Sequence, residues 1–169
     1  MIAINHFTYT DFLSKFGVGG AHPGGIELTK EIVRTKNIDN NSRILDVGCG
    51  TGQTAAYLAS EYGAIVTGID IHPIMIEKAK KRMKKERLPV EILQCSIEKV
   101  PLQDDTFDFV LSESVLSFVD KPTSLSEIYR LLKDGGQLIA IEFTINKPLE
   151  TTIENEIKQF YTFESLPME

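Results

Sequence analysis

One short stretch, residues 44–52, constrains the possible folds and ligands of this chain most strongly. Its apolar run contains Asp46, and glycines occupy alternate positions from Gly48 to Gly52 before helical character begins at Gln53. Glycine adopts positive φ without strain and lets a ligand touch the main chain. The first turn of a helix carries unpaired N–H groups and a partial positive charge, which suit a carboxylate or a phosphate. The stretch therefore predicts a strand, a glycine turn and a helix that together bind a nucleotide-like ligand.

The size and charge of the chain narrow its possible partners. It has 169 residues, a net charge of −6 and a pI near 5.2. This length predicts one domain, and the acidic balance opposes general affinity for nucleic acid. No apolar run approaches the roughly 20 residues that span a bilayer. Cys49 and Cys95 end two predicted strands and are expected to be reduced thiols. We therefore predict a cytoplasmic protein that binds neither nucleic acid nor membrane.

Short apolar segments alternate with segments of helical spacing along most of the chain. The predicted strands are Arg43–Val47, Ala64–Ile69, Val90–Cys95, Phe107–Ser112 and Gln137–Phe143. The predicted helices are Ile26–Lys36, Thr51–Glu61, Pro73–Arg87, Pro122–Leu132 and Thr151–Tyr161. Strands that are apolar nearly throughout are typical of a parallel sheet covered on both faces. The pattern predicts an α/β fold, a doubly wound, mostly parallel, Rossmann-like sheet with helices on both faces.

A second acidic residue closes the next predicted strand. Asp70 lies 22 positions after Gly48. An acid about 20 residues beyond a glycine turn of this kind typically binds ribose hydroxyls. Because Asp70 also precedes Pro73 closely, the alternative is a helix cap. We favour ribose binding on the spacing.

Four segments resemble the motifs of class I S-adenosylmethionine-dependent methyltransferases. They are Asp46–Gly52, Gly68–Asp70, Val100–Val110 and Leu131–Leu138, in the order and spacing of that family. The resemblance covers residues 26–143 and is closest to the small-molecule branch that includes the quinone-biosynthesis C-methyltransferases. It implies S-adenosylmethionine as the cofactor and transfer of its methyl group to a small molecule by in-line displacement.

The resemblance also implies roles for individual residues. Asp46 and the glycine turn would hold the methionine part of the cofactor, and Asp70 the ribose. Ile71 would pack against the adenine, with Ser96 and Ile97 at its edge. The implied cofactor-binding residues are Asp46, Gly48, Cys49, Gly50, Gly52, Asp70, Ile71, Ser96, Ile97 and Ser112. The family usually has an acid at Ser96, so a weaker hydrogen bond to the adenine is expected.

A nicotinamide dinucleotide is the alternative cofactor, with the chain acting as an oxidoreductase. Its fingerprint is G-x-G-x-x-G, whereas Gln53 stands here where the third glycine should be. Asp46 before the turn also suits a ligand ammonium better than a pyrophosphate. Both features disfavour hydride transfer.

Two residues are candidates for catalysis on the acceptor side. Glu113 follows the fourth predicted strand and could orient or deprotonate the acceptor. Capping of the turn that follows is an equal alternative for it. His22 could cover the cofactor or act as a base, with an ordinary loop histidine as the more frequent case. No cluster of His, Cys and acidic residues has metal-ligand spacing, so no metal is predicted. The basic stretch Glu77–Arg87 is expected to be the solvated side of an amphipathic helix.

The ends of the chain define the predicted domain organisation. We expect an N-terminal lid or substrate-side segment at 1–25, a cofactor-binding domain at 26–143 and a helical segment at 144–169. The residues after Phe143 leave no room for the C-terminal hairpin of the family, which favours a truncated chain. An uncovered fifth strand could then pair two copies into a homodimer. A non-catalytic S-adenosylmethionine-binding module is the alternative function.

Overall fold

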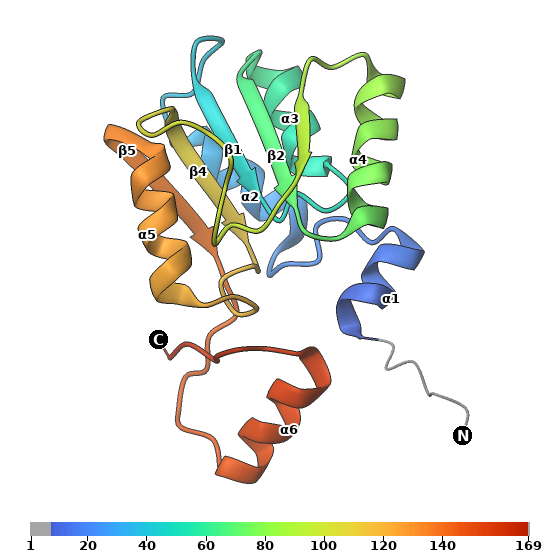
Figure 1. Cartoon of the computed structure of the whole chain (residues 1–169), viewed down its shortest axis with the longest axis vertical. Coiled ribbons are helices and arrows are strands. Elements are labelled where there is room, and N and C mark those ends of the chain that lie inside the picture. The colour runs from blue at the N-terminus through green and yellow to red at the C-terminus, as the bar shows by residue number, and fades with distance from the viewer. Residues whose placement is uncertain (1–7, 169) are drawn as a thin grey trace.

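The computed structural model describes residues 8–168, which form one parallel sheet with helices around it (Figure 1). The strands are β1 (Arg43–Val47), β2 (Ile65–Asp70), β3 (Glu91–Gln94), β4 (Phe107–Glu113) and β5 (Leu132–Ile141). The helices are α1 (Tyr9–Phe16), α2 (Gly25–Arg34), α3 (Gln53–Tyr62), α4 (Pro73–Glu86), α5 (Lys121–Leu131) and α6 (Thr151–Tyr161). The predicted α/β fold is confirmed.

The strand order is β3-β2-β1-β4-β5, so the direction in which strands are added to the sheet reverses between β1 and β4. All pairs between neighbouring strands are parallel, so the carboxyl ends of all five strands lie at one edge of the sheet. Ligands of doubly wound sheets bind beyond that edge, at the point where strand order reverses. This topology places the glycine turn after β1 beside the end of β4.

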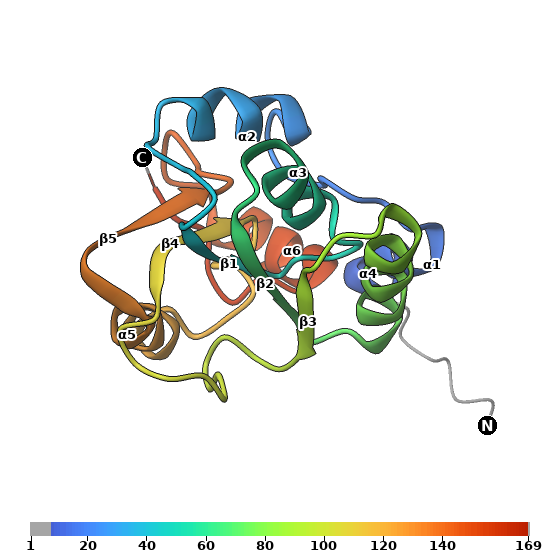
Figure 2. The same cartoon turned by 90° about the horizontal axis from the view of Figure 1, so that it is seen from above.

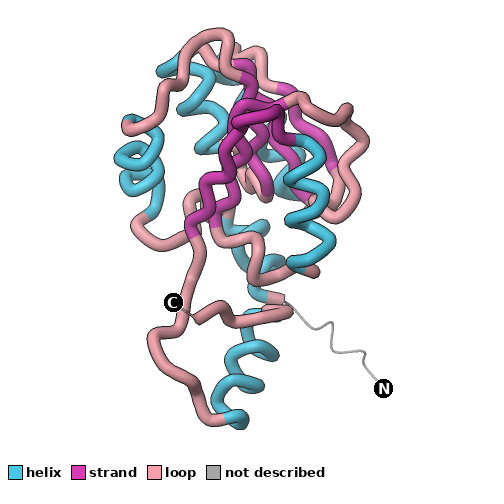
Figure 3. The backbone as a smooth tube through the Cα atoms, turned by 90° about the vertical axis from the view of Figure 1, so that its left-hand side faces the viewer, coloured by secondary structure: helices cyan, strands magenta, loops and turns pink. Residues whose placement is uncertain are grey.

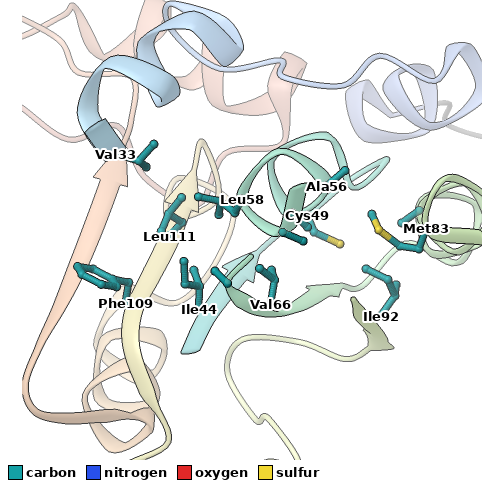
Figure 4. Packing of buried hydrophobic residues seen from close by; sticks show 14 of the residues in the cluster. Val33, Ile44, Cys49, Ala56, Leu58, Val66, Met83, Ile92, Phe109 and Leu111 are labelled. Atoms are coloured by element: carbon teal, nitrogen blue, oxygen red, sulfur yellow. The ribbon is translucent and has the colours of Figure 1, made fainter. Parts of the chain in front are cut away.

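Alternation along the strands divides the core into two layers. Ile44 packs with α2, α3 and α4 on one face, and the next residue, Leu45, packs with α5 on the other. The first layer contains Leu58 of α3 and Met83 of α4, as Figure 4 shows. Figure 2 shows the helices on both sides of the sheet. On the α5 face the segment between β3 and β4 completes the cover, since Ile97 and other residues of that segment are buried there. Both faces are therefore covered, as the apolar strands predicted.

Two elements differ from the sequence prediction. Helix α1 was not predicted, although Thr8 and Asp11 form a capping box at its start. Strand β5 begins at Leu132 rather than Gln137, because Leu132 already pairs with Phe107 ahead of a register irregularity. The other boundaries agree with the prediction to within two residues.

The C-terminal part of the described chain leaves the sheet. Strand β5 is the last strand of the sheet and pairs only with β4 within residues 8–168. After β5 the chain continues to α6, which lies beyond the carboxyl edge of the sheet (Figures 1 and 3). No helix in this described part is long and apolar enough to span a bilayer.

Candidate functional site

The turn after β1 has the backbone shape that its glycines permit. Gly48 and Gly50 have backbone φ angles of 64° and 53°, which residues with a side chain rarely adopt. A Cβ at Gly48 would lie 2.4 Å from Cγ2 of Val115. The Cys49 N–H donates to the Ile69 carbonyl at 2.9 Å, which ties the turn to β2. This close fit leaves no room for a side chain at Gly48. The main chain at Gly48 therefore faces the adjoining cavity.

Helix α4 supports the turn from behind. A Cβ at Gly52 would lie 2.6 Å from Cε of Met83 and 3.2 Å from Cβ of Ala79. Nε of Arg82 donates to the Thr51 carbonyl at 2.9 Å. Gly52 thus lies against α4 and is absent from the cavity lining, unlike the other predicted residues of the turn.

A cavity of about 680 Å³ lies at the carboxyl edge of the sheet. Its walls come from the ends of the strands, the loop before α2, α1 and the segment that contains α6. The lining includes ten residues predicted from the sequence, namely His22, Asp46, Gly48, Cys49, Gly50, Asp70, Ile71, Ser96, Ile97 and Glu113. The structure therefore brings most of the predicted site together in one cavity.

Asp46 is the most unusual residue of the cavity wall. It is 1% exposed, and its Oδ2 has no hydrogen-bond partner among the described residues. Burial, followed by the nearby charge of Glu113, raises the pKa of Asp46 well above its ordinary value, which a hydrogen bond from the Ala55 N–H partly opposes. A buried carboxylate oxygen without a partner is costly in free energy. Such an oxygen suits a cationic ligand group, which would supply the missing partner.

Asp70 accepts a backbone N–H at each carboxylate oxygen. Gly50 donates to Oδ2 at 2.9 Å and His72 donates to Oδ1 at 2.7 Å. Burial still raises the pKa of Asp70 overall. The N-cap of α4 is His72, whose Nδ1 accepts from the Ile74 N–H at 3.3 Å, so the cap alternative for Asp70 is wrong. Each oxygen of Asp70 keeps a second lone pair for a ligand hydroxyl.

Two isoleucines line the cavity just after the ends of β2 and β3. Ile71 is 70% exposed although it lines the cavity, and Ile97, which also lines the cavity, is buried. Oγ of Ser96 accepts from the Glu98 N–H at 3.2 Å. An exposed isoleucine on a cavity wall is suited to cover the face of a flat ligand group.

Ser112 is, with Gly52, one of two predicted cofactor residues that do not line the cavity. It is fully buried in β4, and its hydroxyl donates to Oε1 of Glu142 at 3.4 Å. Oε1 of Glu142 also accepts the N–H groups of Val115 and Leu116, each at 3.0 Å. Glu142, not Glu113, thus caps the turn after β4, and the capping alternative for Glu113 is wrong.

Glu113 and His22, the two catalytic candidates, lie next to each other. Oε1 of Glu113 is 3.6 Å from Nε2 of His22, and both side chains are largely buried. Oε1 accepts from the Thr29 hydroxyl, and Oε2 accepts from the Thr54 hydroxyl at 2.7 Å. Nδ1 of His22 lies 3.2 Å from the Pro23 carbonyl. Glu113 therefore connects β4 with α2, α3 and the loop that carries His22.

Sequence reasoning missed several residues of the cavity wall. Thr51 lines the cavity with a buried hydroxyl that has no partner within the described chain. Its position inside the glycine turn was the available signal. Gly19 also lines the cavity, and a Cβ there would lie 2.6 Å from Oγ1 of Thr51. The aromatic residues of the wall, Tyr9, Phe118, Tyr161 and Phe163, come from three separate segments, so no local pattern indicated that they lie together.

The described residues contain no candidate metal-binding site. Within 8–168, no group of three or more His, Cys, Asp or Glu side chains could hold a metal ion.

Replacing Asp46 with asparagine is predicted to stabilise the ligand-free protein against unfolding. The raised pKa of Asp46 means that the folded state keeps a proton that the unfolded state loses, so the wild type loses stability as pH rises above about 4. Asparagine does not ionise, and it retains an oxygen for the Ala55 N–H. We expect Asp46→Asn to raise the free energy of unfolding by about 1–2 kcal/mol at pH 7. The gain should vanish near pH 4.

Urea unfolding of Asp46→Asn and the wild type at both pH values measures this difference. Asp134→Asn provides a control at an exposed carboxylate of β5. A variant that is less stable than the wild type at pH 7 would contradict the reading of Asp46 as a destabilising buried acid.

Known proteins share both the sequence and the fold of this chain. A model of the methyltransferase domain matches residues 45–140. The uncharacterized methyltransferase YodH of Bacillus subtilis is 46% identical over 158 residues, which cover 94% of this chain and 67% of that protein. The ubiquinone/menaquinone biosynthesis C-methyltransferase UbiE of Geobacter sp. is 32% identical over 142 residues, which cover 80% of this chain and 58% of that protein. The chain thus spans about two thirds or less of the length of these relatives.

A solved structure agrees with these relatives. Phosphoethanolamine N-methyltransferase 2 of Haemonchus contortus, in complex with phosphomonomethylethanolamine and S-adenosylhomocysteine, superposes with a TM-score of 0.82 at 26% identity. The match covers 97% of this chain and 40% of that one. With the domain match over more than half of the chain, these similarities show that the chain belongs to the class I S-adenosylmethionine-dependent methyltransferase family.

Proposed function

We propose that this chain binds S-adenosylmethionine and transfers its methyl group to a small-molecule acceptor. The observation that carries the proposal is the unpartnered Oδ2 of Asp46, buried in the cavity beside the glycine turn. An ammonium group supplies both the charge and the hydrogen bonds that this oxygen lacks. The methionine end of the cofactor carries such a group.

A second unpartnered atom suits the other group of an amino acid. The Thr51 hydroxyl is buried without a partner in the described chain and can donate a hydrogen bond to a carboxylate. It lies in the turn that leads into α3, where free N–H groups and the helix dipole also favour negative charge. One orphaned acceptor and one orphaned donor in the lining of one cavity thus suit the ammonium and the carboxylate of an amino acid.

The remaining predicted residues extend the proposed site along the cavity. The free lone pairs of Asp70 would accept the two ribose hydroxyls, and Ile71 would cover one face of the adenine. Ser96 and Ile97 would lie at the adenine edge. Cys49 would contribute the backbone of the turn, because burial raises the pKa of its thiol and keeps it neutral. We propose Gly48 and Gly50 as main-chain contacts, and Gly52 as a packing residue behind them.

The chain's own part in the reaction would be binding and alignment. When bound, the cofactor supplies a methyl group on a sulfonium, so that the acceptor lone pair forms the new bond while the carbon–sulfur electron pair passes to sulfur. The protein need not supply a nucleophile. Holding the two reactants in line in a cavity that excludes water can account for much of the acceleration.

Glu113 and His22 are proposed to act on the acceptor side of the cavity. Both line the cavity, and Nδ1 of His22 faces the Pro23 carbonyl, so Nδ1 carries the hydrogen and Nε2 is the basic nitrogen. Nε2 would take the proton of an acceptor that must lose one, and Glu113, 3.6 Å from Nε2, would stabilise the imidazolium that forms. Because Glu113 already accepts two threonine hydroxyls, its own role would be to support His22 in this way. Cytoplasmic location, the absence of nucleic-acid and membrane partners, the domain boundaries and pairing through β5 stay predictions.

Isothermal titration with S-adenosylhomocysteine tests the cofactor site. Asp46→Asn is expected to raise the Kd at least about tenfold, since one hydrogen bond to a charged group is worth roughly 1.5–3 kcal/mol. Thr51→Val should weaken binding in the same direction, and Asp134→Asn should leave it unchanged. Binding by Asp46→Asn as tight as by the wild type would refute the proposed ammonium contact.

Transfer of tritiated methyl groups from S-adenosylmethionine to a deproteinised cell extract tests catalysis without a known acceptor. His22→Gln and Glu113→Gln are expected to slow the transfer about 100-fold, as removal of a general base does, while their Kd for S-adenosylhomocysteine stays within about threefold. Glu27→Gln, on the exposed side of α2, is the matched control. Undiminished transfer by both variants would leave Glu113 and His22 with a purely structural role. Cofactor binding without any transfer by the wild type would favour the non-catalytic module.

A further inference from the structure

The cavity has a second half that the proposed cofactor site does not use. The cofactor residues lie at the ends of β1, β2 and β3. The rest of the lining comes from the segments after β4 and β5, from α1 and from residues 157–166. An acceptor must reach the methyl group from this second half, so its lining selects the acceptor. The inference below rests on the proposed function.

Four aromatic rings form a continuous part of this wall. The rings of Tyr9 and Tyr161 meet edge to face at 5.1 Å, and Tyr161 stacks on Phe163 at 5.3 Å. Phe118 meets Phe163 edge to face at 4.8 Å. All four residues line the cavity, together with Leu13. A wall of this kind contacts apolar or ring-shaped ligand groups over a large area, and its ring faces attract cations.

Backbone hydrogen bonds fasten this aromatic wall to the sheet. The Glu164 N–H donates to the Ser117 carbonyl at 2.7 Å, just after β4. The Ile145 N–H donates to the Pro167 carbonyl at 2.9 Å, just after β5. The segment after α6 therefore returns to the ends of β4 and β5, below the sheet in Figure 1. The rings thus belong to the site rather than to a detached helix.

The charged side chains of the cavity are acidic. Asp46, Asp70, Glu98 and Glu113 line it with two histidines, and no lysine or arginine among the described residues does so. The nearby cations have other partners. Nζ of Lys78 donates to the Ser14 carbonyl at 2.6 Å and to the Lys15 carbonyl at 3.0 Å. A phosphate group in this cavity would lose its hydration and meet carboxylates instead of cations.

We propose that the acceptor is an uncharged or cationic small molecule with an apolar, ring-sized body, and that the site rejects phosphorylated acceptors. The aromatic wall provides the contact area for the body, and the two carboxylates that the proposed cofactor site does not use, Glu98 and Glu113, set the preferred charge. The structural neighbour crystallised with a phosphorylated amine shares the fold. The proposal gives this chain the opposite preference for acceptor charge.

Three probes with one carbon skeleton test the proposal on the protein loaded with S-adenosylhomocysteine. They are 2-phenylethylamine, 2-phenylethanol and 2-phenylethyl phosphate, which differ mainly in charge. Ligand-observed NMR titrations are expected to show that the amine and the alcohol bind and that the phosphate ester binds at least about tenfold more weakly. The proposal is overturned if the phosphate ester binds as tightly as the amine, or if none of the three probes binds to the loaded protein.

Variants of the wall show whether the probes occupy this half of the cavity. Tyr161→Ala and the milder Phe163→Leu should weaken binding of the amine and the alcohol at least about threefold. Tyr129→Ala, at an 83% exposed ring on α5 outside the cavity, should leave it unchanged. Equal probe binding by all three variants would place the probes elsewhere and overturn the proposal. Failure of S-adenosylhomocysteine itself to bind would instead count against the proposed function.

Discussion

The buried carboxylate of Asp46 is the constraint on which the site depends. It lies in β1, whose last four residues are buried, and one of its oxygens has no partner among the described residues. The neighbouring carboxylates Glu113 and Asp70 add repulsion to the loss of hydration, and together these effects raise the pKa of Asp46. A folded chain gains nothing in stability from this arrangement. The arrangement is understandable as preparation for a ligand cation, which would remove both costs at once.

Contacts with neighbouring strands and with α4 hold the ligand-facing turn after β1 in place. Gly48 fits against Val115, and Gly50 is tied to Asp70, so that the ends of β1, β2 and β4 fix the turn from three sides. Helix α4 supports it through Gly52 and Arg82. Contacts from several sides hold the main chain of the turn in the shape that the proposed site needs, and a site held in this way spends little binding free energy on ordering the protein.

The sequence predicted the parts of the molecule that rest on local rules. The glycine turn, the acid that ends β2 and the apolar strands each carry their signal within a few residues, and the structure brings the turn and the acid to one edge of a parallel sheet. Helix α1, which was not predicted, also carries a local signal, the capping box formed by Thr8 and Asp11.

The unpredicted parts depend on contacts between distant segments. Glu142 caps the turn after β4 from the end of β5, and Glu113 accepts hydroxyls from α2 and α3. The aromatic wall assembles rings from α1, α6 and the segments beside them. No spacing rule within one element predicts such pairs. They follow from the order of the strands and from the path that the chain takes after β5, which a single sequence does not reveal.

The central claim is that Asp46 is the counter-ion for a cationic group of the cofactor. Carbon-13 NMR of the Asp46 side-chain carboxyl, titrated with pH in the presence and absence of S-adenosylhomocysteine, tests it most directly. The account predicts a carboxyl that titrates well above the ordinary range of about 4 in the free protein and at a distinctly lower pH in the complex. An ordinary pKa in the free protein, or a raised pKa that the ligand leaves unchanged, would contradict it.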